Sequence, residues 1–106
     1  MTERLNANGH RRRQVRARVL AEEDLCALCD QPVDKSLPVN HPRSAVVDED
    51  IPRCRGGSQY RRSNCHLMHR DCNRWKSVMT LAQARAKLAA SGRTAPALMV
   101  RASDIW

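Results

Sequence analysis

The sequence is poor in the large aromatic side chains that usually fill a protein core. Its 106 residues include no Phe, one Tyr and two Trp. A chain of this length forms one small domain, and such domains bury a limited core and often need a staple. With 42% hydrophobic and 28% charged residues, the composition argues against a fully disordered chain. The five cysteines are therefore the first candidates for a staple.

Long apolar runs are also missing. No segment approaches the roughly 18 residues of a membrane span. The N-terminal segment MTERLNANGHRRRQ lacks the apolar core of a secretory signal. We therefore expect no membrane association and a cytoplasmic protein, in a compartment where a disulfide is disfavoured.

Acidic residues are scarce in two stretches of the chain. Residues 4–18 contain six arginines and no acid, and residues 51–76 contain six arginines and one lysine against a single acid. Over the whole chain, 19 Lys and Arg against 11 acids give a net charge of +8. Such clustering predicts a basic surface that binds the phosphate backbone of a nucleic acid. The alternative is a simple bias in composition.

The chain divides into a few segments by pattern. Residues 1–9 are predicted to be a flexible lead, and residues 10–24 a helix with apolar positions on one face and arginines elsewhere. Residues 44–47 predict a short apolar strand. Thr80 is a candidate N-cap for a short helix that ends at Gly92.

The strongest chemical signal is a pair of short spacings between metal-ligating residues. Cys26-x-x-Cys29 and His69-x-x-Cys72 are separated by 39 residues. Two such pairs supply four ligands for a tetrahedral Zn²⁺, which would also explain how a thin core holds together. The alternatives are reduced cysteines packed as small hydrophobes, or a disulfide.

Two further cysteines and a neighbouring histidine stand outside this paired spacing. Cys54 and Cys65 are predicted to serve in packing. His66 competes with His69 as a fourth ligand, but only His69 has the x-x-Cys spacing.

An acidic cluster follows the predicted strand within an otherwise basic region. Asp48, Glu49 and Asp50 are framed by arginines and followed by Gly56-Gly57. Carboxylates that hold a hard cation beside arginines that hold phosphates suit a metal-dependent phosphodiesterase. The alternative is that the three acids simply balance the arginines around them.

Two segments together resemble the HNH endonuclease family. VVDEDIPRCRGG and SNCHLMHRDCNRWKS, preceded by CALCDQPVDKSLP, are most similar to the small zinc-stabilised HNH proteins of bacteriophages. The resemblance covers residues 11–77, about two-thirds of the chain. It implies an α+β fold with a ββα-metal core stapled by zinc, flanked by an N-terminal basic helix and a short C-terminal helix. The nuclease domain would span residues 10–77, and residues 78–106 would form the C-terminal helix and tail.

The resemblance also assigns roles to individual residues. Asp48 and Asn73 match the ligands of the catalytic divalent ion, expected to be Mg²⁺ or Mn²⁺, and Asn64 matches the asparagine that orients the loop by hydrogen bonding. The zinc ligands would be Cys26, Cys29, His69 and Cys72. The implied activity is endonucleolytic hydrolysis of DNA, with phosphate contacts from Arg11, Arg12, Arg13, Arg16, Arg53, Arg55, Arg61 and Arg62.

The sequence departs from the family at residue 49. The family's general base is His at this position, and this chain has Glu49. A carboxylate is ionised at neutral pH and can activate water, although an unperturbed one is a weaker base than imidazole. Glu49 is therefore expected to be the base or a second metal ligand. Asp50 is a possible ligand because it would share a strand face with Asp48.

Two other functions remain open. One is a zinc-stabilised DNA-binding module without catalysis, and the other is a docking module for a phage terminase or portal protein. The resemblance to phage proteins further implies a role beside the terminase in genome packaging, in the host cytoplasm.

Overall fold

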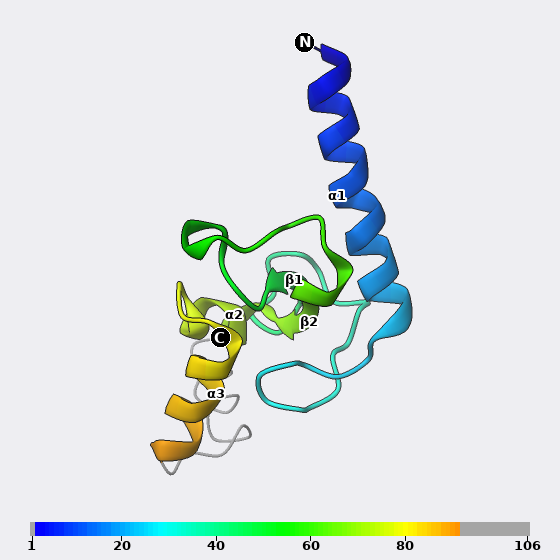
Figure 1. The fold of residues 1–106 in the computed structure, drawn as a ribbon. Helices are drawn as coiled ribbons and strands as arrows, with labels where there is room; N and C mark the ends of the chain where they lie inside the picture. The colour runs from blue at the N-terminus through cyan, green and yellow to red at the C-terminus, as the bar shows by residue number, and fades with distance from the viewer. Residues whose placement is uncertain (1, 92–106) are drawn as a thin grey trace.

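The computed structural model describes residues 2–91 and shows a small α+β fold. Figure 1 shows a long helix that stands beside a short hairpin of strands, with two shorter helices on the other side. The elements follow in the order α1 (Thr2–Glu22), β1 (Ala45–Glu49), β2 (Cys65–His69), α2 (Arg70–Lys76) and α3 (Leu81–Ala90). Single turns of 3-10 helix at Arg53–Arg55 and Arg62–Asn64 interrupt the connection between the strands.

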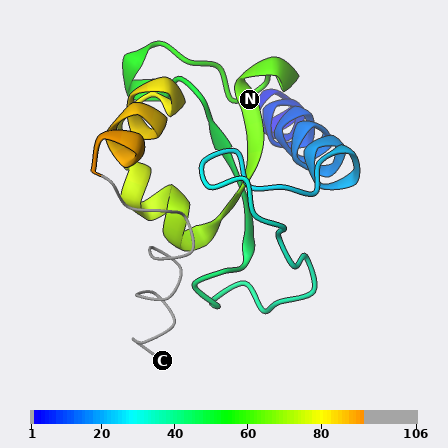
Figure 2. The same cartoon turned by 90° about the horizontal axis from the view of Figure 1, so that it is seen from below.

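The two strands form an antiparallel sheet whose register decides which side chains meet. Val47 pairs with Leu67, and Asp48 pairs with His66. Because successive strand residues point to opposite faces, Val47 and Glu49 lie on one face and Asp48 lies on the other. Figure 2 shows α1 on one side of the strands and the helices α2 and α3 on the opposite side.

The core is aliphatic and sulfur-rich, as expected for a chain with few aromatics. Val15 and Val19 are buried on α1, at the helical spacing that the sequence predicted. Leu67 and Met68 on β2 are buried, with exposures of 0% and 2%. The core also contains Cys26, Cys29, Cys65 and Cys72.

Helix α3 begins where its sequence signal predicts. The Thr80 hydroxyl accepts a hydrogen bond from the Gln83 amide, and the Gln83 side chain accepts one from the Thr80 amide. This capping box satisfies amides that otherwise lack partners at the start of a helix. Gly92, the predicted end of the helix, and the tail after it lie outside the described residues.

The structure corrects two expectations. Helix α1 begins at Thr2 instead of residue 10, so the predicted lead is helical from that point. The 31 residues before the first proline contain nothing that must break a helix, and Asn8 and Gly9 only weaken it. Cys54 is exposed in the turn Arg53–Arg55 and does not serve in packing, whereas Cys65 is buried as expected.

No helix within residues 2–91 combines the length and the apolar character needed to cross a membrane.

Candidate functional site

Four metal-ligating side chains converge beneath the strand hairpin. The sulfurs of Cys26, Cys29 and Cys72 and a ring nitrogen of His69 all lie within 4.8 Å of one another, and all four residues are buried. His69 Nδ1 lies 3.4 Å from Cys29 Sγ and 3.8 Å from Cys72 Sγ. A tetrahedral zinc with bonds of about 2.3 Å to sulfur and about 2.0 Å to nitrogen separates its ligands by about 3.5–3.8 Å.

The first two ligands are brought together by a tight turn. The Asp30 amide donates to the Cys26 carbonyl and the Cys26 amide donates to the Gln31 carbonyl, both at 2.9 Å. Asp30 has φ +62°, a left-handed conformation that Asp tolerates better than most residues. Arg85 of α3 clamps this turn, since it donates to the Ala27 carbonyl and pairs with Asp30 at 3.2 Å.

The remaining two ligands lie where β2 runs directly into α2. His69 is the last residue of the strand, and Cys72 lies in the first turn of the helix. The far nitrogen of the imidazole, Nε2, lies 3.0 Å from the Pro32 carbonyl, which can only accept a hydrogen bond. Nε2 is therefore protonated, and Nδ1 is left to face the three sulfurs. A metal-bound imidazole is commonly fixed in this way.

The electrostatics of the cluster favour a positive charge at its centre. Burial lowers the pKa of His69, but hydrogen bonds to Cys26 and Cys29 and their charges outweigh it and raise that pKa to about 10. Hydrogen bonds from Cys29 and Cys72 lower the pKa of the Cys26 thiol. The four residues can therefore hold a metal ion, and the donor set is consistent with a structural zinc.

A second polar cluster lies one turn further along α2, next to β1. Asp48 of β1 accepts a salt bridge from Lys76 Nζ at 2.8 Å. Lys76 Nζ also donates to the Glu49 carbonyl at 3.0 Å. With its amide nitrogen turned toward the carboxylate, Asn73 donates to Asp48 Oδ2 at 2.9 Å. The structure thus brings together Asp48 and Asn73, the two residues that the resemblance pairs as ion ligands, and adds Lys76 to them.

The other two acids of the predicted cluster take separate positions. His66 Nδ1 lies 2.7 Å from Asp50 Oδ1, and the two side chains are 30% and 29% exposed. Glu49 is on the opposite face of β1 from Asp48, toward α1. Within residues 2–91, the three acids form no group of at least three converging Cys, His, Asp or Glu ligands like that around His69.

Asn64 fixes the loop between the strands. Its Oδ1 accepts from the Ile51 amide at 3.0 Å, and its Nδ2 donates to the carbonyls of Ile51 and Ser58 at 3.1 and 3.0 Å. The backbone approaches so closely here that a Cβ on Gly57 would lie 1.6 Å from the Ile51 carbonyl oxygen. This is the positioning that the resemblance implies for Asn64.

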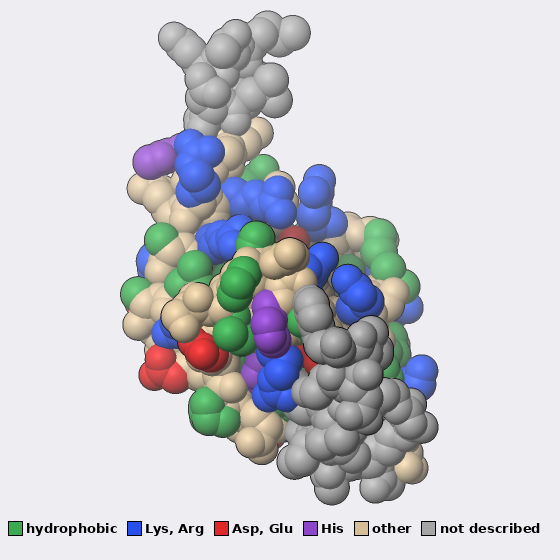
Figure 3. All heavy atoms as spheres, turned by 180° about the vertical axis from the view of Figure 1, so that it is seen from behind, with side chains coloured by type: hydrophobic (Ala, Val, Ile, Leu, Met, Phe, Trp, Pro, Cys, Tyr) green, Lys and Arg blue, Asp and Glu red, His purple; other side chains and the backbone are tan. Residues whose placement is uncertain are grey.

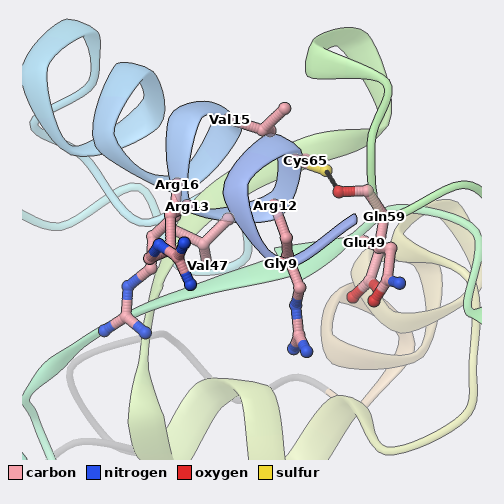
Figure 4. Close-up of a pocket in the computed structure, with 9 residues that line it drawn as sticks. All are labelled: Gly9, Arg12, Arg13, Val15, Arg16, Val47, Glu49, Gln59 and Cys65. Atoms are coloured by element: carbon pink, nitrogen blue, oxygen red, sulfur yellow. Dashed lines mark hydrogen bonds between the residues drawn. The ribbon is translucent and has the colours of Figure 1, made fainter. Parts of the chain in front are cut away.

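Figure 4 shows a pocket between α1, β1 and the loop before β2. Its volume is about 350 Å³, and its lining includes Glu49, Gln59 and three of the predicted phosphate-binding arginines, Arg12, Arg13 and Arg16. The arginines project from α1, while Glu49 and Gln59 lie side by side at one end of the pocket. The pocket therefore joins residues of the predicted basic helix to an acid of the predicted active site.

The other predicted DNA-binding arginines divide into two groups. Arg53 and Arg61 are exposed. Arg11 lies over the Tyr60 ring at 4.7 Å, and Arg55 donates to Gln83 at 3.1 Å. Figure 3 shows Lys and Arg side chains gathered across the upper part of one face, next to the N-terminal half of α1.

Arg62 has a structural position. Its guanidinium pairs with Glu22 at 2.9 Å and with Glu23 at 2.8 Å, and it donates to the Cys65 carbonyl. Negative charges are unfavourable at the C-terminal end of a helix, where Glu22 and Glu23 lie. The positive charge of Arg62 offsets this repulsion. Its guanidinium is less free to bind a phosphate than those of the exposed arginines.

Sequence reasoning missed Lys76 and the pairing of Asp50 with His66. Lys76 is completely buried, whereas a lysine at the end of a short basic helix predicts an exposed side chain. Lys76 lies four residues after Cys72, and this spacing places both side chains on the same side of α2. Because Cys72 was a predicted metal ligand, the spacing could have indicated that Lys76 is buried.

Comparisons with protein-family models, with curated proteins and with solved structures find no match to this chain.

Proposed function

We propose that this chain is a zinc-stapled, divalent-metal-dependent endonuclease that hydrolyses phosphodiester bonds of DNA. The pocket lined by Glu49 and the three α1 arginines is the observation that carries the proposal. Residues that are 33 or more positions apart in the sequence line one pocket, with guanidinium groups for the phosphate and a carboxylate for water.

The charges in the pocket are arranged to receive a ligand. Arg12, Arg13 and Arg16 are exposed on α1. Among the described side chains, none forms a hydrogen bond or ion pair with the Glu49 carboxylate. A phosphodiester bound by the arginines would lie beside a free carboxylate. Glu49 would then act as the general base that takes a proton from the attacking water.

The Cys26, Cys29, His69 and Cys72 cluster would hold zinc in a purely structural role, because four protein ligands leave no open position. Asp48 and Asn73 would hold the catalytic ion, since a carboxylate and an amide oxygen are ligands that Mg²⁺ and Mn²⁺ prefer. The Asn73 amide would turn its oxygen to the ion for this purpose. Asp48 and Glu49 lie on opposite faces of β1, so an ion held by Asp48 would have to reach the bound phosphodiester around the end of the strand. There it would stabilise the charge that develops on the phosphate and the leaving oxygen.

One observation favours a second function, a zinc-stapled DNA-binding module without catalysis. Lys76 already neutralises Asp48. In that case the arginines would bind the phosphate backbone and the acids would serve only to stabilise the fold.

Nicking of supercoiled plasmid separates the two functions. Zinc-loaded protein is mixed with plasmid in Mg²⁺ or Mn²⁺, and the matched control omits the divalent ion, because a chelator would also remove zinc. The parent is expected to nick the plasmid only with the ion. Glu49→Gln is expected to lower the rate by about 10²–10⁴-fold with unchanged DNA affinity, because it removes a base and no phosphate contact.

DNA binding tests the arginines independently of cleavage. Arg12→Gln is expected to weaken binding and to lower the salt dependence by about one released counterion. Arg74→Gln, an exposed arginine of α2 outside the pocket, is the matched control. A parent that binds DNA and never nicks it would establish the binding module instead. Equal rates for the parent and Glu49→Gln would exclude Glu49 as the base.

A further inference from the structure

The Lys76 ammonium sits in the position that a cation bound to Asp48 would occupy. The side chain is 1% exposed, and Nζ is 2.8 Å from Asp48 Oδ2. The Glu49 carbonyl accepts its second hydrogen bond at 3.0 Å. A carboxylate oxygen and a backbone carbonyl oxygen are both typical ligands of hard cations.

Burial makes this arrangement hard to displace. A lysine is almost never fully buried unless its charge is paired, because the desolvation cost is large. Asp48 supplies the pairing charge, and its own side chain is 18% exposed. Removal of either partner would leave the other charge buried without compensation.

Apart from the Asn73 amide, no converging set of ligands in the described part of the chain strengthens this site for a divalent ion. No group of three or more converging Cys, His, Asp or Glu ligands contains Asp48 within residues 2–91. The Asn73 amide also satisfies Asp48 when its nitrogen faces the carboxylate. A divalent ion at Asp48 would therefore meet a single carboxylate and an ammonium group within a few ångströms, and like charges at that distance repel.

We propose that Lys76 is the resident cation of the Asp48 site, and that a divalent ion binds there only in competition with it. The inference rests on the proposed function for the assignment of Asp48 as an ion ligand. Lys76 would then determine how much Mg²⁺ or Mn²⁺ the protein needs, and it would keep the site folded when the ion is absent.

Direct Mn²⁺ binding tests the competition without reference to cleavage. Zinc-loaded parent and Lys76→Gln are titrated with Mn²⁺ and followed by electron paramagnetic resonance of the free ion. The glutamine keeps a hydrogen-bond donor and removes the charge. We expect Mn²⁺ to bind Lys76→Gln roughly tenfold or more tightly than the parent, because the repulsion is gone. The Cys and His cluster does not take up Mn²⁺, since it prefers zinc.

Thermal unfolding supplies the second measurement. A ligand that binds only the folded state raises its stability. Mn²⁺ should therefore raise the Tm of Lys76→Gln and leave that of the parent nearly unchanged. If Lys76→Gln is unfolded alone, Mn²⁺ should restore its fold. Lys35→Gln, which removes the charge of an exposed lysine paired with Asp24, is the matched control and should behave as the parent.

Two results would overturn the inference. One is a parent that binds Mn²⁺ as tightly as Lys76→Gln, and the other is tight Mn²⁺ binding that persists in the double variant Asp48→Asn/Lys76→Gln. The proposed function fails separately. A parent that never nicks DNA, with tighter Mn²⁺ binding in Lys76→Gln, would refute the nuclease and support the competition.

Discussion

The two polar clusters on α2 are one helical turn apart, and they are stabilised in different ways. His69 and Cys72 face the Cys26–Cys29 turn, where four buried ligands surround one point. Asn73 and Lys76, each four residues further on, face Asp48 and form an ion pair that is already complete. The first cluster needs a cation from outside, and the second contains its own. A short helix can therefore present both kinds of site when the strands beside it supply different partners.

The largest effect is expected from loss of a ligand in the first cluster. Cys72→Ser should abolish zinc binding and unfold the domain, because metal binding and folding are coupled in domains with so small a core. Elemental analysis and far-UV circular dichroism measure the two losses. Cys54→Ser is the matched control, since this exposed cysteine should leave zinc content and Tm unchanged. A parent without zinc, or a folded Cys72→Ser protein, would contradict the difference between the clusters.

Removal of the internal cation of the second cluster should have the next largest effect. Lys76→Met leaves the Asp48 carboxylate without its partner, at a cost of about 3–5 kcal/mol in the free energy of unfolding. Lys35→Met, which breaks the exposed pair with Asp24, should cost less than about 1 kcal/mol. Urea unfolding of zinc-loaded proteins gives both values. Equal costs for the two lysines would mean that burial does not strengthen the Asp48 pair.

A smaller effect is expected from Asn64→Ala, which tests whether the second cluster depends on its loop. The change removes three hydrogen bonds to Ile51 and Ser58 and should lower the free energy of unfolding by about 1–3 kcal/mol. Zinc content should stay constant, because none of these groups contacts a metal ligand. Thermal unfolding with parallel zinc analysis measures both. Loss of zinc in Asn64→Ala would show that the two clusters are not separable.

The smallest effect is expected from Arg85→Met, on the outer side of the first cluster. Arg85 clamps the Cys26–Cys29 turn through Asp30, but its side chain is 48% exposed. Exposed pairs contribute about 0–1 kcal/mol, so Tm should shift by a few degrees at most. Competition with a chromophoric chelator should give nearly the parent zinc affinity. A large loss of affinity would mean that α3 helps to form the metal centre.

Local spacing predicted the first cluster completely because its geometry is local. Two residues three apart in a turn or at a helix start point to the same side, whatever the rest of the chain does. Thr80 and Gln83 likewise predicted the start of α3, since a capping box is formed within one turn. Only the meeting of the two ligand pairs required the fold, and their chemistry made that meeting favourable.

The second cluster was predicted only in part because its partners come from separate elements. Asp48 and Asn73 were paired through a resemblance, and no periodicity places a residue of β1 beside one of α2. The burial of Lys76 and the position of Glu49 on the face toward α1 follow from the strand register and from how the helices cover the sheet.

The sequence by itself determined the four metal ligands, the basic character of α1 and the cap of α3, because each depends on neighbours within a few residues. The tertiary structure alone decided which charges face each other. It placed Arg62 against the acids that end α1, Lys76 against Asp48, and the α1 arginines beside Glu49. The spacing of charged residues along the sequence does not reveal which of them will pair. Their partners are decided only when packing sets the distance of each charge from water and from other charges.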